Sequence, residues 1–415
     1  MAKIRGTQQN DVLTGGDGND LIRGLAGDDI LRGGLGNDTF RPGSGADAMY
    51  GQGGDDIAIL SALDSATPDT FDGGGGRDTL NARAASDDFF RLIAWSYDTA
   101  TSLYTLSQFG TPADQPDAFS FTNVEVLIGS DQDDQMLFSF APDDLTIFGG
   151  TGDDRIYVGD GDDVVRGGAG DDQITGGDGR DQLFGDGGND TISVGYRGSG
   201  LLDGGKGWDT LEADGSVDLA RGYAITGAGQ RVTIRNFENV SISGFTEGEV
   251  VRGDDGKNVI DADFAFDSVT LRGAGGADTI TGGDEDDRLY GDAGNDLLNG
   301  GAGSDRLWGG TGRDVFRFGD DFFSQPVGAD RIMDFSRTER DRVDLTGMDA
   351  DTTLEGTQAF RFIGWTTFTG RAGEVRFDAD GIETRIQLDT NGDALPDVNI
   401  FLDQSMLLQR NDFIL

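Results

Sequence analysis

Aspartate recurs at every ninth residue in three stretches of the chain, and its neighbours are mostly glycines. Such a segment offers only oxygen ligands, from carboxylates and backbone carbonyls. Rows of carboxylates one strand spacing apart, ~4.8 Å, repel one another unless a cation lies between them. Ca²⁺ takes six to eight oxygen ligands in flexible geometry, whereas Mg²⁺ requires a smaller octahedral cage and retains water. The pattern therefore predicts calcium binding, by roughly ten ions if each stacked pair of repeats holds one.

The predicted calcium ligands in the repeats are Asp11, Asp20, Asp29, Asp38, Asp47, Asp56, Asp78, Asp134, Asp154, Asp163, Asp172, Asp181, Asp190, Asp209, Asp278, Asp287, Asp296, Asp305 and Asp314.

The nonapeptide register is strict. Six consecutive units start at Gly6, five at Gly149 and five at Gly273. Gly occupies the first position in 14 of these 16 units, and Asp occupies the sixth position in all 16. A solvated acidic surface would not confine its Asp residues to one phase of a repeat. Four isolated units lie outside the runs, starting at Gly73, Gly129, Gly204 and Gly253, the last with Asn258 in place of Asp.

Each unit is too short for a helix, and its positions seven to nine predict a three-residue strand with only residue eight facing inward. Glycines in positions one to six allow positive φ and close approach of the backbone. Two units would make one turn of a flattened coil, so that unit n stacks on unit n+2. The predicted inward residues are Leu13, Ile22, Leu31, Phe40, Met49, Ile156, Val165, Ile174, Leu183, Ile192, Ile280, Leu289, Leu298, Leu307 and Phe316.

The unit resembles the GGxGxDxUx nonapeptide of the RTX (repeats-in-toxin) proteins, a calcium-binding parallel β-helix repeat. The resemblance covers most of the chain. It implies an all-β fold of calcium-stacked parallel β-rolls in three blocks, with antiparallel β inserts and a C-terminal β cap. The predicted segments are roll blocks at 1–81, 129–212 and 253–317, inserts at 82–128 and 213–252, and a cap at 318–415.

The two inserts lack the period, and we expect them to be short antiparallel β segments packed on the roll. FTNVE at Phe121 and FENVS at Phe237 look like one element copied. Because the inserts interrupt the repeats, we favour three short rolls over one continuous roll. For the aromatic residues of the first insert, Trp95, Tyr97 and Tyr104, core packing is favoured over a ligand site.

The segment after the third run resembles the C-terminal domain of the serralysin proteases, through DRIMDF, DRVDLTGM and AGEVRFD. Its loop offers Asp389, Asn391, Asp393 and Asp397 as calcium ligands, with the spacing of the front half of an EF-hand. A plain Asn-Gly hairpin turn is an equal alternative. The chain ends in one acid and three apolar residues, Asp412–Leu415. The resemblance implies an uncleaved signal there for the type I secretion machinery of a Gram-negative bacterium.

Composition excludes several classes of function. The 415 residues include no Cys and no His, which excludes a Ser-His-Asp triad and a zinc protease of the HExxH kind. The 76 Asp and Glu against 32 Lys and Arg give a net charge of −44, which repels nucleic acid and anionic membranes. No apolar run is long enough for a membrane span, and Met1–Val12 lacks the apolar core of a secretory signal peptide.

The leading hypothesis is a secreted, non-enzymatic calcium-binding protein that folds on extracellular Ca²⁺. It would act at a surface, in a matrix or in adhesion, with a cell-surface or polysaccharide target as candidate partner. The rival hypothesis is a carbohydrate-active or other enzyme with a carboxylate site in the inserts, where Asp87, Asp88 and Glu125 are candidates. A third is a detached repeat and secretion module that partners a catalytic chain.

Overall fold

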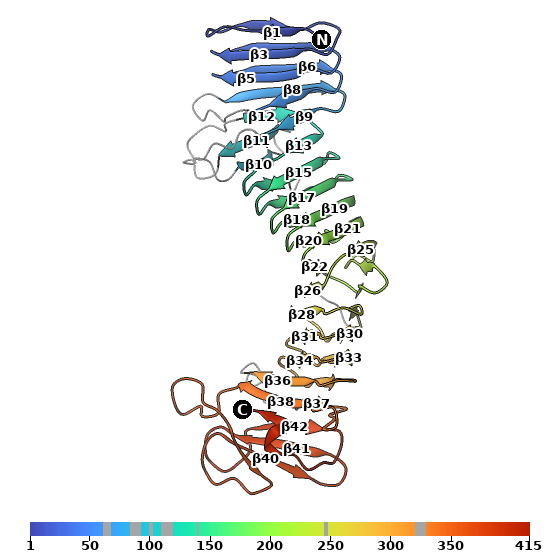
Figure 1. Cartoon of the computed structure of the whole chain (residues 1–415), viewed down its shortest axis with the longest axis vertical. Helices are drawn as coiled ribbons and strands as arrows, with labels where there is room; N and C mark the ends of the chain where they lie inside the picture. The colour runs from blue at the N-terminus through green and yellow to red at the C-terminus, as the bar shows by residue number, and fades with distance from the viewer. Residues whose placement is uncertain are drawn as a thin grey trace. The chain divides into compact units, whose positions relative to one another are not determined.

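The computed structural model describes residues 1–60, 68–83, 93–98, 103–108, 119–138, 141–244, 248–319 and 329–415. The chain divides into two compact units. The N-terminal unit comprises Met1–Leu211 with Gln230–Phe237, and the C-terminal unit comprises Glu212–Gly229 with Glu238–Leu415. Within each unit, strands stack as successive rungs of parallel ladders (Figure 1). No helix among the described residues is long and apolar enough to cross a membrane.

In the N-terminal unit, residues 18 positions apart lie side by side. β3 pairs in parallel with β5, with Leu21 opposite Thr39, and β2 pairs in parallel with β4, with Val12 opposite Ile30. Two nonapeptides therefore make one turn, as predicted, and alternate units contribute to two facing sheets.

The first ladder of this unit contains β1 (Lys3–Arg5), β3 (Leu21–Ala26), β5 (Thr39–Ser44), β7 (Ile57–Ile59), β9 (Thr79–Asn81), β13 (Val126–Ile128), β15 (Thr146–Thr151), β17 (Val164–Ala169), β19 (Arg180–Gly187), β21 (Ser199–Lys206) and β25 (Arg231–Arg235). The second contains β2 (Val12–Thr14), β4 (Ile30–Leu35), β6 (Ala48–Gly53), β8 (Asp69–Gly75), β12 (Phe119–Thr122), β11 (Leu103–Gln108), β10 (Ile93–Asp98), β14 (Gln135–Leu137), β16 (Arg155–Tyr157), β18 (Gln173–Thr175) and β20 (Thr191–Ser193). The boundary between the two units falls within β22 (Thr210–Ala213).

The expectation of separate rolls is wrong for the first two runs. β13, from the first insert, pairs in parallel with β9 on one side and with β15 on the other, so that Leu80, Leu127 and Ile147 are aligned. The insert strands β10, β11 and β12 pair antiparallel to one another, as expected, but β12 also continues the ladder from β8 and β10 continues it to β14. The insert therefore supplies rungs of the roll, because its end strands keep one apolar residue facing inward.

In the C-terminal unit the first ladder contains β23 (Val217–Asp218), β27 (Val250–Arg252), β29 (Thr270–Arg272), β32 (Arg288–Tyr290), β35 (Arg306–Trp308), β37 (Arg331–Ile332) and β42 (Val398–Leu402). The second contains β26 (Asn239–Ser243), β28 (Val259–Phe264), β31 (Thr279–Thr281), β34 (Leu297–Asn299), β36 (Val315–Gly319), β38 (Arg342–Gly347) and β43 (Phe413–Ile414). β24 (Tyr223–Ile225) pairs antiparallel with β23, and β30 (Gly275–Gly276) pairs with β33 (Ala293–Gly294).

The cap strands β42 and β43 continue the two ladders of this unit. β39 (Arg361–Gly364) pairs with β40 (Glu374–Ala379), and β40, β41 (Thr384–Asp389) and β42 form an antiparallel meander. β42 then pairs in parallel with β37, so the meander extends the roll. A 3₁₀ turn at Arg410–Asp412 precedes β43, which pairs in parallel with β38.

The core consists of apolar side chains that face inward from the two sheets of each unit. Fourteen of the fifteen predicted inward residues are at most 1% exposed. The exception is Leu13, which is half-buried because β2 pairs only with β4 in the described part of the chain. Several strands exceed the three predicted residues: β3 and β4 each run for six, into the first positions of the following unit. Tyr104 also packs in the core, stacked on Phe121 with ring centroids 5.1 Å apart. The side chains of Trp95 and Tyr97 lie outside the described part.

The copied element of the two inserts has the same conformation in both copies. Asn123 and Asn236 have φ of 52° and 56°, in the left-handed region that Asn tolerates. The amide of Asn123 donates to Asp72 Oδ1 at 2.7 Å, and that of Asn236 donates to Asp203 Oδ1 at 2.6 Å. In both places the Asn returns the chain to the stack after a run of repeats has ended.

Candidate calcium sites

The sixth-position aspartates join successive turns through one carboxylate oxygen. Asp29 Oδ1 accepts the backbone N–H of Asp11 at 2.8 Å, and Asp47 Oδ1 accepts that of Asp29 at 2.8 Å. The carboxylate thus bonds to the turn before it. Oδ1 makes this bond in Asp20, Asp29, Asp38, Asp47, Asp56, Asp78, Asp154, Asp163, Asp172, Asp181, Asp190, Asp209, Asp278, Asp287, Asp296, Asp305 and Asp314.

The second oxygen of most of these carboxylates is buried and has no hydrogen-bond partner among the described residues. The aspartates whose second oxygen lacks a partner are each at most 2% exposed. A buried carboxylate oxygen without a donor lowers the stability of the fold, because it has lost its hydrogen bonds to water and gained none within the protein. We call a turn open when the Oδ2 atom of its sixth-position Asp is buried and has no hydrogen-bond partner among the described residues. The open turns are those of Asp29, Asp38, Asp47, Asp56, Asp78, Asp154, Asp163, Asp172, Asp181, Asp190, Asp278, Asp296, Asp305 and Asp314.

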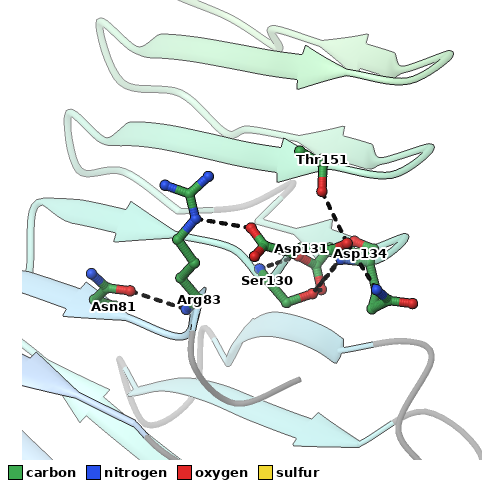
Figure 2. A network of polar contacts seen from close by, with 7 residues as sticks. Asn81, Arg83, Ser130, Asp131, Asp134 and Thr151 are labelled. Atoms are coloured by element: carbon green, nitrogen blue, oxygen red, sulfur yellow. Dashed lines mark hydrogen bonds and ion pairs between the residues drawn. The ribbon is translucent and has the colours of Figure 1, made fainter. Parts of the chain in front are cut away.

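A second class of turn, which we call closed, satisfies the same oxygen internally. The backbone N–H of the second residue of the unit donates to Oδ2, at distances between 2.6 and 3.0 Å, in the turns of Asp11, Asp20, Asp134 and Asp287. Figure 2 shows the closed turn of Asp134, where Ser130 is the donor. Asn258, which replaces Asp in its unit, likewise accepts the N–H of Asp254 at 2.9 Å.

The conformation of the second residue decides between the two classes. In every open turn except that of Asp163 this residue has a positive φ, for example 111° at Gly34 and 75° at Ala274. None of the closed turns has a positive φ at this position. The left-handed conformation turns the N–H away from the carboxylate and leaves Oδ2 without a donor.

Main-chain carbonyl oxygens lie beside the orphaned carboxylate oxygens. A Cβ built on Gly149 would lie 2.2 Å from Asp154 Oδ2 and 2.5 Å from the carbonyl oxygen of Gly167, in the next turn. At Gly33 the corresponding distances are 2.2 Å to Asp38 Oδ2 and 2.8 Å to the Gly51 carbonyl. Oxygen atoms of two successive turns therefore converge on the same small space, which a side chain at Gly149 or Gly33 would fill.

These oxygens fit calcium. No group of three or more acidic side chains that could hold a metal ion occurs among the described residues. The donor set is therefore one carboxylate oxygen per open turn together with backbone carbonyls, all of them the hard oxygens that Ca²⁺ accepts. Calcium bound there would give the buried oxygens the positive partner that the described residues do not provide. The number of ions, roughly ten, stays a prediction.

Burial raises the pKa of the open-turn carboxyls, and neighbouring carboxylates raise it further. The pKa of Asp154 rises to about 9, that of Asp181 to about 8 and that of Asp172 to about 7, in each case mainly through desolvation. Without a cation, these groups therefore tend to hold a proton near neutral pH. A bound cation would favour the charged form and reverse the shift.

Four acids outside the nonapeptide register extend the carboxylate columns and were not predicted to belong to them. Asp69, Glu125, Asp330 and Asp341 accept the backbone N–H of the sixth-position Asp one turn earlier, at 2.7, 2.8, 2.9 and 3.0 Å. A signal was present for all four, since each is followed two residues later by a buried apolar residue, as in a repeat. Glu125, a candidate catalytic acid, thus has a structural partner. Asp87 and Asp88 lie outside the described residues.

The fifth positions form a second column of side-chain hydrogen bonds, which was not predicted from the sequence. Here the side chain accepts the N–H of the turn that follows: Asn10 Oδ1 accepts from Asp28 at 3.0 Å, and Asp171 Oδ1 accepts from Asn189 at 2.7 Å. These residues are exposed, unlike the sixth-position aspartates. The two columns tie each turn both to the turn before it and to the turn after it.

The C-terminal loop uses its acidic oxygens for its own backbone. The fully buried Asp389 accepts the N–H groups of Gly392 at 2.7 Å and Ala394 at 3.0 Å. Asp397 accepts the N–H of Thr390 at 2.7 Å and the amide of Asn391 at 2.8 Å. Asn391 Oδ1 and Asp393 Oδ1 each accept a backbone N–H two residues on. This is the bonding of a hairpin turn between β41 and β42, and calcium binding by this loop stays a prediction.

Gly149→Ala tests the space beside the carboxylate. The new methyl group would meet Asp154 Oδ2 and the Gly167 carbonyl, so we expect a loss of about 3 kcal/mol in the free energy of unfolding in calcium. Gly187→Ala is the matched control, because its nearest neighbour would be 3.8 Å away and its φ is not positive. The control should change stability by less than about 1 kcal/mol. Urea denaturation in calcium measures the free energy of unfolding of both variants. Equal losses of stability would contradict the assignment of a calcium site to the space beside Gly149.

Comparison with protein families identifies the repeats. The family model of the RTX calcium-binding nonapeptide repeat (4 copies) matches residues 5–40, 65–90, 146–174, 157–192, 270–298 and 290–322. No curated protein matches the chain. Among solved structures, the solution structure of the AlgE6R3 subunit from the Azotobacter vinelandii mannuronan C5-epimerase is 26% identical. That match covers 36% of this chain and 72% of the subunit, with a TM-score of 0.18.

The family matches end at residue 322, and the resemblance of the cap to the serralysin C-terminal domain stays a prediction. The matched residues contain open turns from both units, with their buried carboxylates and converging carbonyls. The chain therefore carries RTX calcium-binding nonapeptide repeats in both of its units.

Proposed function

We propose that the chain is exported unfolded and folds outside the cell as calcium fills the open turns, to act there without enzymatic activity in a surface, matrix or adhesion role. The observation that carries this proposal is the set of buried, unpartnered Oδ2 atoms. Each is a charge that the folded protein must neutralise. A chain with a net charge of −44 opposes its own compaction until cations bind.

Calcium concentration supplies the switch between the two states. Extracellular calcium-binding modules have dissociation constants of ~10⁻⁴–10⁻³ M, which millimolar external calcium exceeds and cytosolic calcium does not approach. Because the sites exist only in the stacked roll, binding free energy becomes folding free energy. The meander of the C-terminal unit would nucleate its roll, since a solenoid gains stability from neighbouring turns and needs a cap.

The tail supports export before folding. In the folded unit Phe413 is 2% exposed and pairs with Val343, and Asp412 accepts the N–H of Gln409 and the guanidinium of Arg337. A secretion machinery that reads Asp412 and Phe413 would therefore find them accessible only before this unit folds. Under type I secretion from a Gram-negative cell, the signal would therefore be read on the unfolded chain.

A calcium titration followed by far-UV circular dichroism tests the proposal, with magnesium as the control cation. We expect a cooperative coil-to-β transition at submillimolar to millimolar calcium and none at the same concentrations of magnesium. Mg²⁺ should fail because it holds its water and demands short octahedral distances. A chain that is already fully folded in EDTA at neutral pH would overturn the proposal.

An enzyme with a site in the first insert is the second candidate, and one cavity favours it. A cavity of about 420 Å³ in the N-terminal unit is lined by Tyr104, Asn123, Glu125, Asp143 and Asp144, among others. Tyr104 donates to Asp143 Oδ2 at 2.6 Å. Hydrolysis of a panel of polysaccharides that is lost on Asp143→Asn, with calcium-dependent folding retained, would support this candidate over a non-enzymatic role.

A further inference from the structure

One outward face of the C-terminal unit combines arginines with stacked aromatic rings. The strands β27, β29, β32 and β35 lie side by side in parallel register. Their outward positions place Thr270, Arg288 and Arg306 in one column. The neighbouring column consists of Arg252, Arg272, Tyr290 and Trp308. We call Arg252, Arg272, Arg288, Tyr290, Arg306 and Trp308 the arginine–aromatic strip.

Most of the charge on this strip is uncompensated. Arg272 forms an ion pair with Asp292 at 3.1 Å. The side chains of Arg252, Arg288 and Arg306 are exposed, and none of them makes an ion pair or hydrogen bond with the described residues. Successive arginines stand one strand spacing apart, ~4.8 Å, where like charges repel. A chain with 76 acids and only 32 cations could easily have placed acids here, so this face is suited to an anionic ligand.

The aromatic rings add to the positive character of the strip. Tyr290 and Trp308 stack with ring centroids 4.4 Å apart and planes at 10°, and the Arg272 guanidinium lies 4.5 Å from the Tyr290 centroid. Both faces of the Tyr290 ring are therefore covered by neighbours. The rings present their edges, which carry the positive end of the ring quadrupole, alongside the guanidinium groups.

We propose that the arginine–aromatic strip binds an anionic polysaccharide whose carboxylate groups lie along the column of strands. Arginine pairs with carboxylates through two parallel N–H groups, and a polymer with one carboxylate per sugar repeats its charge along the chain as the strip does. The covered faces of the Tyr290 ring argue against a single-stranded nucleic acid, which binds by stacking its bases on free aromatic faces. The inference rests on the proposed function only in that calcium must fold the sheet.

Binding of short oligogalacturonates, which do not gel, tests the proposal on the full chain in saturating calcium. Isothermal titration calorimetry gives the dissociation constant. We expect Arg288→Gln/Arg306→Gln to weaken binding by about tenfold or more. Arg313→Gln removes a charge from an exposed turn of the same unit and should leave affinity within about twofold, since its charge is off the strip. Trp308→Phe should keep most of the affinity but lose the ligand-induced change in tryptophan fluorescence.

Two probes separate the alternatives. Neutral dextran should not bind, and a single-stranded oligothymidylate should bind more weakly than oligogalacturonate. Absence of oligogalacturonate binding, equal weakening by Arg313→Gln, or tighter binding of the oligonucleotide would each overturn the proposal. The calcium-induced circular dichroism transition of every variant is the independent readout. A normal transition with no ligand binding would reject the strip alone, whereas a missing transition in the unmodified chain would reject the proposed function.

Discussion

Replacing Asp172 by Asn should raise the calcium concentration at which the chain folds by about threefold to tenfold. Asp172 Oδ1 accepts the backbone N–H of Asp154 at 2.8 Å, and an Asn oxygen can keep this bond. Asp172 Oδ2 is buried and has no partner among the described residues, and Asn replaces it by an uncharged NH₂ group that cannot bind Ca²⁺. The substitution therefore removes a metal ligand while it preserves the link between the turns. The midpoint of a calcium titration followed by circular dichroism measures the effect.

The neighbouring Asp171→Asn is the matched control. Asp171 is exposed, and its Oδ1 accepts the N–H of Asn189 at 2.7 Å, a bond that Asn also preserves. Both substitutions change the net charge by the same amount, one residue apart on the same turn. The control should leave the midpoint within about twofold, because a solvated fifth-position charge contributes little. Equal shifts in the two variants would mean that overall charge, and not ligation at the sixth position, controls folding.

The local architecture could be predicted because the repeat encodes it within nine residues. The apolar eighth position and the two-unit turn follow from the alternation of a strand and from the glycines that return the chain. The same reasoning failed at the first insert. Thr79 pairs with Val126, 47 residues further on, and no periodic signal connects them. Only the three-dimensional fit of Leu127 between Leu80 and Ile147 shows that the insert supplies a rung.

The residues of the candidate sites could be predicted from the sequence, but whether each turn is open or closed could not. Gly16 and Gly34 both occupy the second position of a unit, yet Gly34 has φ of 111° and leaves Asp38 Oδ2 free, whereas Gly16 donates its N–H to Asp20 Oδ2. Identical residues thus give an open and a closed turn. Position in the run does not explain the difference, because Asp11 and Asp20 lie in the first two units of a run whereas Asp287 forms a closed turn inside a stack.

In the absence of calcium, acid should fold the chain. The direction of this pH dependence follows from the raised pKa values. In the folded state the pKa is about 9 for Asp154, about 8 for Asp181 and about 7 for Asp56, whereas an unfolded Asp has the ordinary pKa of 3.8. Between about pH 4 and pH 9 the metal-free folded state therefore binds more protons than the unfolded state. Its free energy of unfolding is highest at the acidic end of this window and falls as the pH rises through the folded-state pKa values.

Far-UV circular dichroism in EDTA should therefore show β structure at about pH 5 and its loss by about pH 8. About pH 5 is above the sequence pI of 4.1, so the chain keeps a net negative charge.

Asp154→Asn/Asp181→Asn should move the transition to higher pH and make it less steep, because two buried carboxyls no longer exchange protons on folding. Asp153→Asn/Asp171→Asn, at exposed fifth positions, is the control with the same charge. Loss of structure on acidification would contradict the sign, and would mean that the folded protein stabilises these carboxylates in their charged form. Calcium should act in the opposite direction, since it needs deprotonated ligands, and its effect on folding should be large at neutral pH and small at about pH 5.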